Sequence, residues 1–115
     1  MADVTDRQYE QKIESSIQAK GLTAPRVTPD DLDQMMDAAQ IQYHVFPGTT
    51  VTVCCAVLNN GYALVGTAAA ASPENFDEAI GREVAWKDAR NQLWALLGFR
   101  LRDHLSEYAV TSKER

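Results

Sequence analysis

The feature that most constrains the fold of this chain is a β-hairpin signal at its centre. Residues Thr50–Leu58 are rich in β-branched side chains, which favour strands. Asn59-Asn60-Gly61 follows, and an Asn-Gly pair readily adopts positive φ at both central positions of a tight turn. The return strand is predicted over Tyr62–Ala70, and its end at Ala68–Ala71 is small enough to let a helix lie close. Because an isolated hairpin is marginally stable in water, a further element must complete the sheet.

Two helices are predicted before the hairpin. The first begins at Thr5, which can form a reciprocal capping box with Gln8, and ends near Gly21, a residue suited to a helix stop. The second begins at Thr28, a natural N-cap followed by a proline. The apolar stripe of the first helix is Tyr9, Ile13 and Ile17, and the buried face of the second is Leu32, Met35, Met36 and Ala39.

The longest helix is predicted after the hairpin. Ser72 followed by Pro73 gives its start, and Gly98 is expected to kink or interrupt it before Phe99–Leu105 carries it on. Its apolar side is formed by Phe76, Ala79, Trp86, Leu93 and Leu97, widened by Ile80, Val84 and Trp94. Glu78–Arg82 and Glu83–Lys87 are spaced for favourable i, i+4 ion pairs.

These elements predict an α+β fold in which a long C-terminal helix packs on a small antiparallel sheet of two or three strands. Residues 1–24 are expected to form an N-terminal helical arm, and residues 25–115 a single α+β core domain. Either Ile41–Phe46 adds a third strand, or the hairpin pairs across a subunit interface. We expect a homodimer.

The charge of the chain bounds its partners. A net charge of -5 argues against broad binding to nucleic acid or to an anionic membrane, which requires clustered Lys and Arg. It is compatible with a protein partner that carries a basic face. The start of the sequence lacks an apolar signal-peptide run, and no stretch is long and apolar enough to span a membrane. The expected location is the cytoplasm of a bacterial host.

The residue types do not favour enzymatic chemistry, a metal site or a cofactor. Cys54 and Cys55 are adjacent, so on a strand they point to opposite faces and form a poor disulfide pair. No further cysteine and no suitably spaced histidine completes a zinc site. A nucleophile–base pair between a cysteine and His44 is disfavoured, because a thiolate in an apolar strand is unstable. The cysteines are therefore predicted to be buried small hydrophobes.

The candidate ligand- or partner-binding residues are polar and aromatic. Asn75 lies near a predicted helix start, where backbone N–H groups can hold an anion. Arg82, Arg100 and Arg102 can add positive charge, so the four residues are predicted to line one phosphate or nucleotide pocket at a subunit interface. The alternative is a capped helix with ordinary surface arginines. Tyr43 and His44 lie close to Pro47-Gly48, which is expected to break the strand. His44 is predicted either to face a ligand or to be a partly buried, hydrogen-bonded structural histidine. Of Trp86 and Trp94, one is expected to pack in the core and the other to be partly exposed as an interface anchor.

Several blocks of the chain, taken together, resemble a known family. They are Leu22–Pro29, Tyr43–Cys55, Asn60-Gly61, Ser72–Arg82 and Gly98–Arg102. In this combination the sequence resembles a small family from tailed bacteriophages and prophages, named after the early-region products gp forty-nine and gp sixty-six. The resemblance implies a phage origin, a host-cytoplasm setting and expression beside other accessory genes. It supplies no catalytic residues to transfer.

A second resemblance concerns the fold alone. Strand, Asn-Gly turn, strand and long helix are similar to the second half of a double-stranded-RNA-binding domain, whose last helix begins with phosphate-gripping lysines. Here the matching segment, Pro73–Glu78, is acidic. A shape analogy of this kind carries no functional warrant by itself.

The leading hypothesis is a non-enzymatic phage accessory protein that binds a host protein, for host takeover or for inhibition of an antiviral defence system. One alternative is a protein that binds a small ligand such as a nucleotide signal. Another is a nucleic-acid-binding module of the double-stranded-RNA type.

Overall fold

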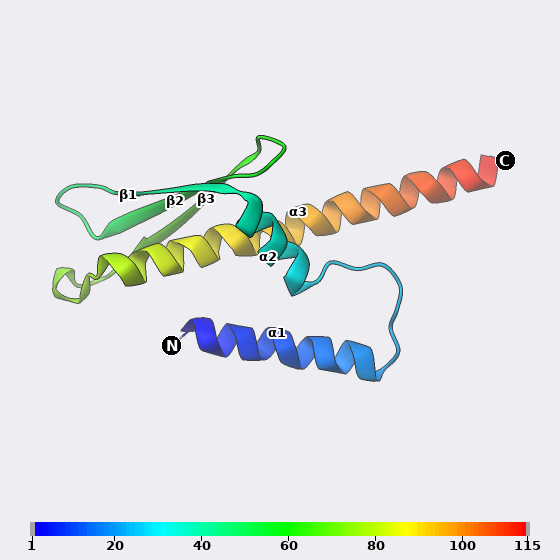
Figure 1. The fold of residues 1–115 in the computed structure, drawn as a ribbon, viewed down its shortest axis with the longest axis horizontal. Helices are drawn as coiled ribbons and strands as arrows, with labels where there is room; N and C mark the ends of the chain where they lie inside the picture. The colour runs from blue at the N-terminus through cyan, green and yellow to red at the C-terminus, as the bar shows by residue number, and fades with distance from the viewer. Residues whose placement is uncertain (1, 115) are drawn as a thin grey trace.

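The computed structural model describes the backbone of residues 2–114 and the side chains of residues 6–107. This part of the chain forms three α-helices and three strands, and a long loop joins α1 to α2 (Figure 1). The elements are α1 (Ala2–Ala19), α2 (Pro29–Ala38), β1 (Gln40–Val45), β2 (Val51–Val57), β3 (Ala63–Ala69), a short 3-10 turn (Pro73–Asn75) and α3 (Glu78–Glu114). The predicted α+β fold is confirmed, and the third strand is supplied by the chain itself.

The sheet is antiparallel in the order β1-β2-β3, and α3 runs along one of its faces (Figure 1). Alternate residues of β2 point toward the helix, and Thr52, Cys54 and Ala56 are fully buried there. The hydrophobic core lies in this layer between the sheet, α2 and α3. It is formed by Leu32, Met36, Cys54, Ala56, Leu58, Leu64, Ala85, Ala89, Leu93 and Leu97.

The tightest contact between α3 and the sheet is at Gly66 of β3. A Cβ atom at this position would clash with the backbone oxygen of Ala85 and would lie 2.5 Å from the backbone nitrogen of Ala89. The two alanines and the glycine therefore let the helix backbone approach the strand closely. The sequence pattern predicted this approach at Ala68–Ala71, two residues further along the chain.

The β2–β3 turn has a different geometry from the predicted one. Gly61 has a φ of 89°, but no residue other than glycine has a positive φ among the described residues, so Asn60 does not take this conformation. The Gly61 N–H donates to the Leu58 oxygen, and the Leu58 N–H donates to the Tyr62 oxygen, each over 2.9 Å. This is a three-residue loop with a type I turn and a glycine bulge.

The ends of the first two helices are largely as predicted. Thr28 caps α2 through a reciprocal capping box with Asp31. Gly21, with a φ of 66°, ends α1, and the N–H groups of Gly21 and Leu22 satisfy the last helical carbonyls. The predicted start of α1 at Thr5 is wrong, because the helix already begins at Ala2.

The predicted start of the last helix at Ser72 is also wrong. Ser72 precedes only the 3-10 turn and makes no side-chain cap bond. The α-helix starts at Glu78, where Asp77 Oδ1 accepts the N–H of Ile80 over 2.9 Å. Gly98 does not interrupt the helix, which continues to Glu114.

Candidate functional site

One face of the sheet is uncovered in the part of the chain that the structure describes. The helices lie on one side of the sheet (Figure 1). Cys54 is buried on that side, so the residues of β2 and β3 that alternate with the buried ones point to the opposite side. This open face is defined by Val51, Val53, Cys55 and Val57 of β2 and by Val65 of β3. The Val65 side chain is 51% exposed. An apolar row of this kind on a sheet is a candidate protein-binding surface.

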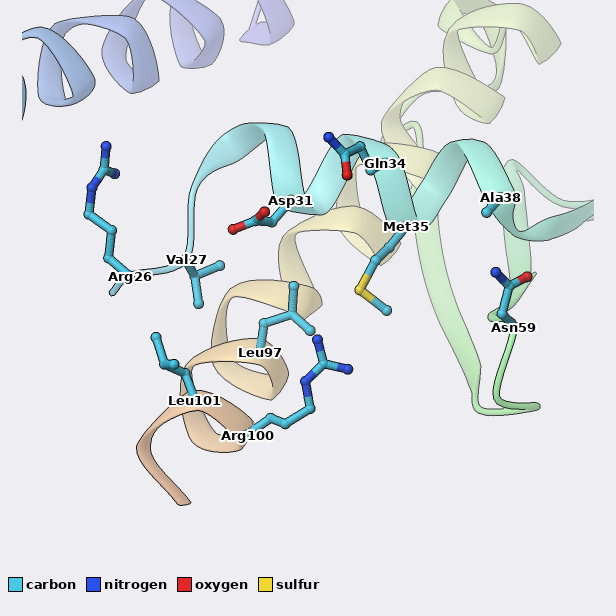
Figure 2. A pocket seen from close by; sticks show the side chains of 10 residues that line it. All are labelled: Arg26, Val27, Asp31, Gln34, Met35, Ala38, Asn59, Leu97, Arg100 and Leu101. Atoms are coloured by element: carbon cyan, nitrogen blue, oxygen red, sulfur yellow. The ribbon is translucent and has the colours of Figure 1, made fainter. Parts of the chain in front are cut away.

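A second candidate site is a pocket of about 380 Å³ between α2, the β2–β3 turn and α3 (Figure 2). Arg100 points into the space below Met35, and Leu97 and Leu101 supply apolar walls. The complete lining is Arg26, Val27, Asp31, Gln34, Met35, Ala38, Asn59, Leu97, Arg100 and Leu101. We call this the Arg100 pocket.

The two arginines of the Arg100 pocket differ in their partners. Arg26 is already bound by both carboxylate oxygens of Glu14, over 2.6 and 2.7 Å. Among the described side chains, Arg100 makes no ion pair and no hydrogen bond. Its guanidinium, together with the amides of Gln34 and Asn59, is available to an anionic group.

Helix α1 is held against the rest of the molecule by carboxylates. Glu10 binds Arg90 through both oxygens over 2.9 and 3.0 Å, and Asp6 binds Lys87. With Glu14, these acids recur every four residues and form one stripe of α1. Much of the apolar stripe is exposed instead, since Tyr9 is 64% exposed and Ile13 is also exposed. A cleft of about 440 Å³ separates them from Trp94.

The attachment of α1 is expected to weaken in acid. Glu14 has a pKa below its ordinary value of 4.5, chiefly because it accepts hydrogen bonds from Arg26. Its stabilising contribution is therefore fully present above that ordinary value and is lost as the pH falls through the lower folded pKa. Protection of the α1 amides against hydrogen exchange should fall over this window before the protection of the sheet amides does. Equal protection of α1 above and below it would contradict this attachment.

The predicted binding residues do not form one pocket within a single chain. Arg82 and Arg100 both lie on α3, but eighteen residues apart, which is about 27 Å along the helix axis. Asn75 lines a separate hollow of about 130 Å³ with Ile80 and Val84. Arg102 is exposed and lines none of the hollows described above. A shared site for these residues would require contributions from more than one copy.

Tyr43 and His44 are neighbours in sequence but point to opposite faces of the sheet. Tyr43 points to the helix side of β1, where burial raises the pKa of its hydroxyl, Cys54 adds to that effect and Arg82 opposes it. His44 points to the open face and packs edge-on against Phe46, with ring centroids 4.7 Å apart.

The two predicted ion pairs of α3 differ in outcome. Arg82 pairs with Glu78 over 3.8 Å, as predicted. Lys87 pairs with Asp6 rather than with Glu83.

Both tryptophans are partly buried. Trp86 and Trp94 both pack against the core and both remain partly exposed, so the structure does not single out one of them as the partly exposed anchor that the sequence predicted. Trp86 lines a small hollow with Lys87 and Arg90 beneath α1.

Sequence reasoning missed Arg90, the most buried charged side chain in the described region. It is 7% exposed and joins Glu10 of α1 to Asp33 of α2, the latter over 2.8 Å. Sequence reasoning also missed Gln34 and Asn59, which line the Arg100 pocket. The only sequence signal for Arg90 was its position between the core alanine Ala89 and Leu93.

The cysteines fit a structural role. Both are free; Cys54 is buried and Cys55 is half-buried on the opposite face. Burial raises the pKa of the Cys54 thiol, which disfavours a reactive thiolate. The described residues contain no group of acidic, histidine or cysteine side chains arranged to hold a metal ion. Within the described chain, no helix has both the length and the apolar character needed to cross a membrane.

Comparison with known proteins places the chain in a family. Residues 27–105 match the model of the phage protein family described as N4 Gp49/phage Sf6 gene 66. The match covers α2, the whole sheet and most of α3, and it excludes α1. No curated protein and no solved structure matches the chain.

Proposed function

The chain belongs to this family of phage proteins, and on that premise we propose that it is a non-enzymatic accessory protein that binds a host protein. Its setting is the cytoplasm of the infected bacterium, and its effect is host takeover or inhibition of an antiviral defence system. The observation that carries the proposal is the open face of the sheet. Apolar side chains there remain in contact with water although the chain has a complete core on the other face.

The chemistry of the partner follows from the composition of the surface. The open face offers an apolar centre, and the chain as a whole carries a net charge of -5. A partner with an apolar patch and a basic surround, such as the groove of a nucleic-acid-binding protein, is complementary to both features. Association should therefore slow at high salt, because screening reduces electrostatic steering.

A charge placed on the open face should abolish partner binding. Val65→Arg puts a guanidinium on the open face, whereas Ile80→Arg makes the same change at a similarly exposed position on α3. We expect Val65→Arg to lower the affinity for the partner at least about tenfold, which corresponds to about 1.4 kcal/mol. Ile80→Arg should bind the partner with wild-type affinity. Affinity capture from infected-cell lysate, followed by titration of the recovered protein, measures this difference. Equal recovery by both variants would refute the role of the open face.

A second candidate function is favoured by the Arg100 pocket. An unpaired guanidinium, two amide side chains and an apolar floor together suit a small anionic ligand with an apolar part, such as a nucleotide signal. The pocket differs from the one predicted from the sequence, since it contains Arg100 but neither Asn75 nor Arg82.

Two neighbouring arginines provide a matched test of this second function. Arg100→Ala removes the charge from the pocket, and Arg102→Ala removes an exposed charge two residues away. If a nucleotide binds, the first variant should lose about 10- to 100-fold in affinity, as expected for a hydrogen bond to a charged group, and the second should not. Thermal-shift titration with a nucleotide panel measures both. No shift for the wild type, or equal loss in both variants, would exclude the pocket as the site.

Nucleic-acid binding of the double-stranded-RNA type receives less support. The first turn of α3 carries Glu78 and is capped by Asp77, so the place where that module presents lysines is negative here. A filter-binding assay at about 50 mM salt, where electrostatic association is strong, tests it directly.

A further inference from the structure

The two edges of the sheet are treated differently by the rest of the molecule. At the β3 edge, Asp88 Oδ2 accepts the N–H of Thr67 over 2.9 Å, and Gln92 Nε2 donates to the Val65 oxygen over 2.7 Å. Side chains of α3 therefore form hydrogen bonds with backbone groups in the middle of this edge. A further strand cannot add there without displacing them.

The β1 edge is open. The Phe46 N–H donates to the Val51 oxygen, which fixes the alternation of the β1–β2 hydrogen bonds. By this alternation the N–H and C=O groups of Ile41, Tyr43 and Val45 point away from β2. Within the described residues, no side chain or backbone group bonds to them. Strand β1 also has no charged residue and no proline, the usual devices that prevent edge pairing.

Strand β1 is complementary to itself. In an antiparallel pair centred on Tyr43, Ile41 of one copy lies opposite Val45 of the other, and Gln42 lies opposite His44. The first pair is apolar, the central pair is aromatic, and the Gln42–His44 pair can hydrogen-bond. No cross-strand pair brings like charges together, and each of these pairings is of a favourable kind.

We propose that two copies of this chain associate through β1 about a twofold axis at Tyr43, joining their sheets into one continuous sheet. The free backbone groups of Ile41, Tyr43 and Val45 would be satisfied by the same groups of the second copy. On the helix side, the Tyr43 side chains of the two copies would meet at the axis. On the opposite side, the open faces of the two copies become continuous. This assembly is independent of which partner the open face binds.

The test places like charges across the proposed axis. In the double variant Gln42→Lys/His44→Lys, the lysine introduced at position 42 of each copy would lie opposite the lysine introduced at position 44 of the other, and the two charges would repel. Gln42 and His44 are both exposed in the single chain, so the substitutions should not disturb its fold. The matched control, Ala63→Lys/Thr67→Lys, adds the same two side chains to the same sheet face at the β3 edge. Val65→Arg tests association through the open face. Sedimentation equilibrium measures the mass of each protein, and circular dichroism checks that each is folded.

We expect the wild type and the control to have twice the 12.7 kDa mass of the chain, and the β1 variant to be a folded monomer with a dimer dissociation constant raised at least about tenfold. Val65→Arg should remain dimeric. A monomeric wild type would overturn the proposal. So would a β1 variant that dimerises normally, or a dimer that only Val65→Arg dissociates.

Discussion

Replacing Gly66 by alanine is expected to lower the free energy of unfolding by about 3 kcal/mol or more, a large part of the stability of a small domain. The added Cβ would meet the backbone of Ala85 and lie 2.5 Å from the Ala89 nitrogen, so α3 would have to move away from the sheet. Backbone atoms in a helix cannot turn aside as a flexible side chain can. The displaced helix would also loosen the core that it shares with β2 and β3.

Gly98→Ala is the matched control for this prediction. Gly98 lies in the interior of the same helix, and a Cβ there would meet nothing within 4 Å. The change should raise stability by up to about 1 kcal/mol, because alanine is the better helix former. Urea denaturation measures both effects. Similar stabilities for the two variants would contradict the close approach at Gly66.

Replacing Arg90 by methionine is expected to cost about 3 kcal/mol and to release α1. The guanidinium is buried and binds Glu10 and Asp33, so its removal leaves two carboxylates without their partner. Arg82→Met removes an arginine from an exposed i, i+4 pair on the same helix and should change stability by no more than about 0.5 kcal/mol.

Hydrogen exchange distinguishes the two consequences of the Arg90 change. Loss of protection in α1 together with lower global stability is expected for Arg90→Met, and neither for Arg82→Met. An α1 that stays protected in Arg90→Met would show that the remaining pairs of Asp6 and Glu14 suffice to hold it.

Local signals were enough to predict much of the fold. The capping residues of α2, the stop at Gly21 and the alternation of β2 are each encoded within a few neighbouring residues. The start of α3 was misplaced because Ser72-Pro73 and Asp77 are both acceptable caps, and only the tertiary structure selects the second. The predicted turn type was wrong because, within this turn, only Gly61 takes positive φ. A glycine bulge accommodates the twist of the two strands instead.

The candidate sites were harder to predict, because they depend on contacts that are distant in sequence. Arg90 meets Asp33 and Glu10 across 57 and 80 residues, and no local pattern encodes such pairs. Likewise, Arg100 and Arg102 are close in sequence, yet helix geometry places Arg100 in the pocket beneath α2 and leaves Arg102 exposed. The sheet edges became distinguishable only through the contacts of Asp88 and Gln92, which close one of them.

The most direct test of the proposed function is native mass spectrometry of the tagged protein, captured from the lysate of phage-infected cells at low salt. Host-protein binding predicts a discrete additional protein mass on the wild type that is missing from Val65→Arg. A wild-type protein that carries only an added mass of several hundred daltons, or no added mass beyond its own subunits, would contradict it.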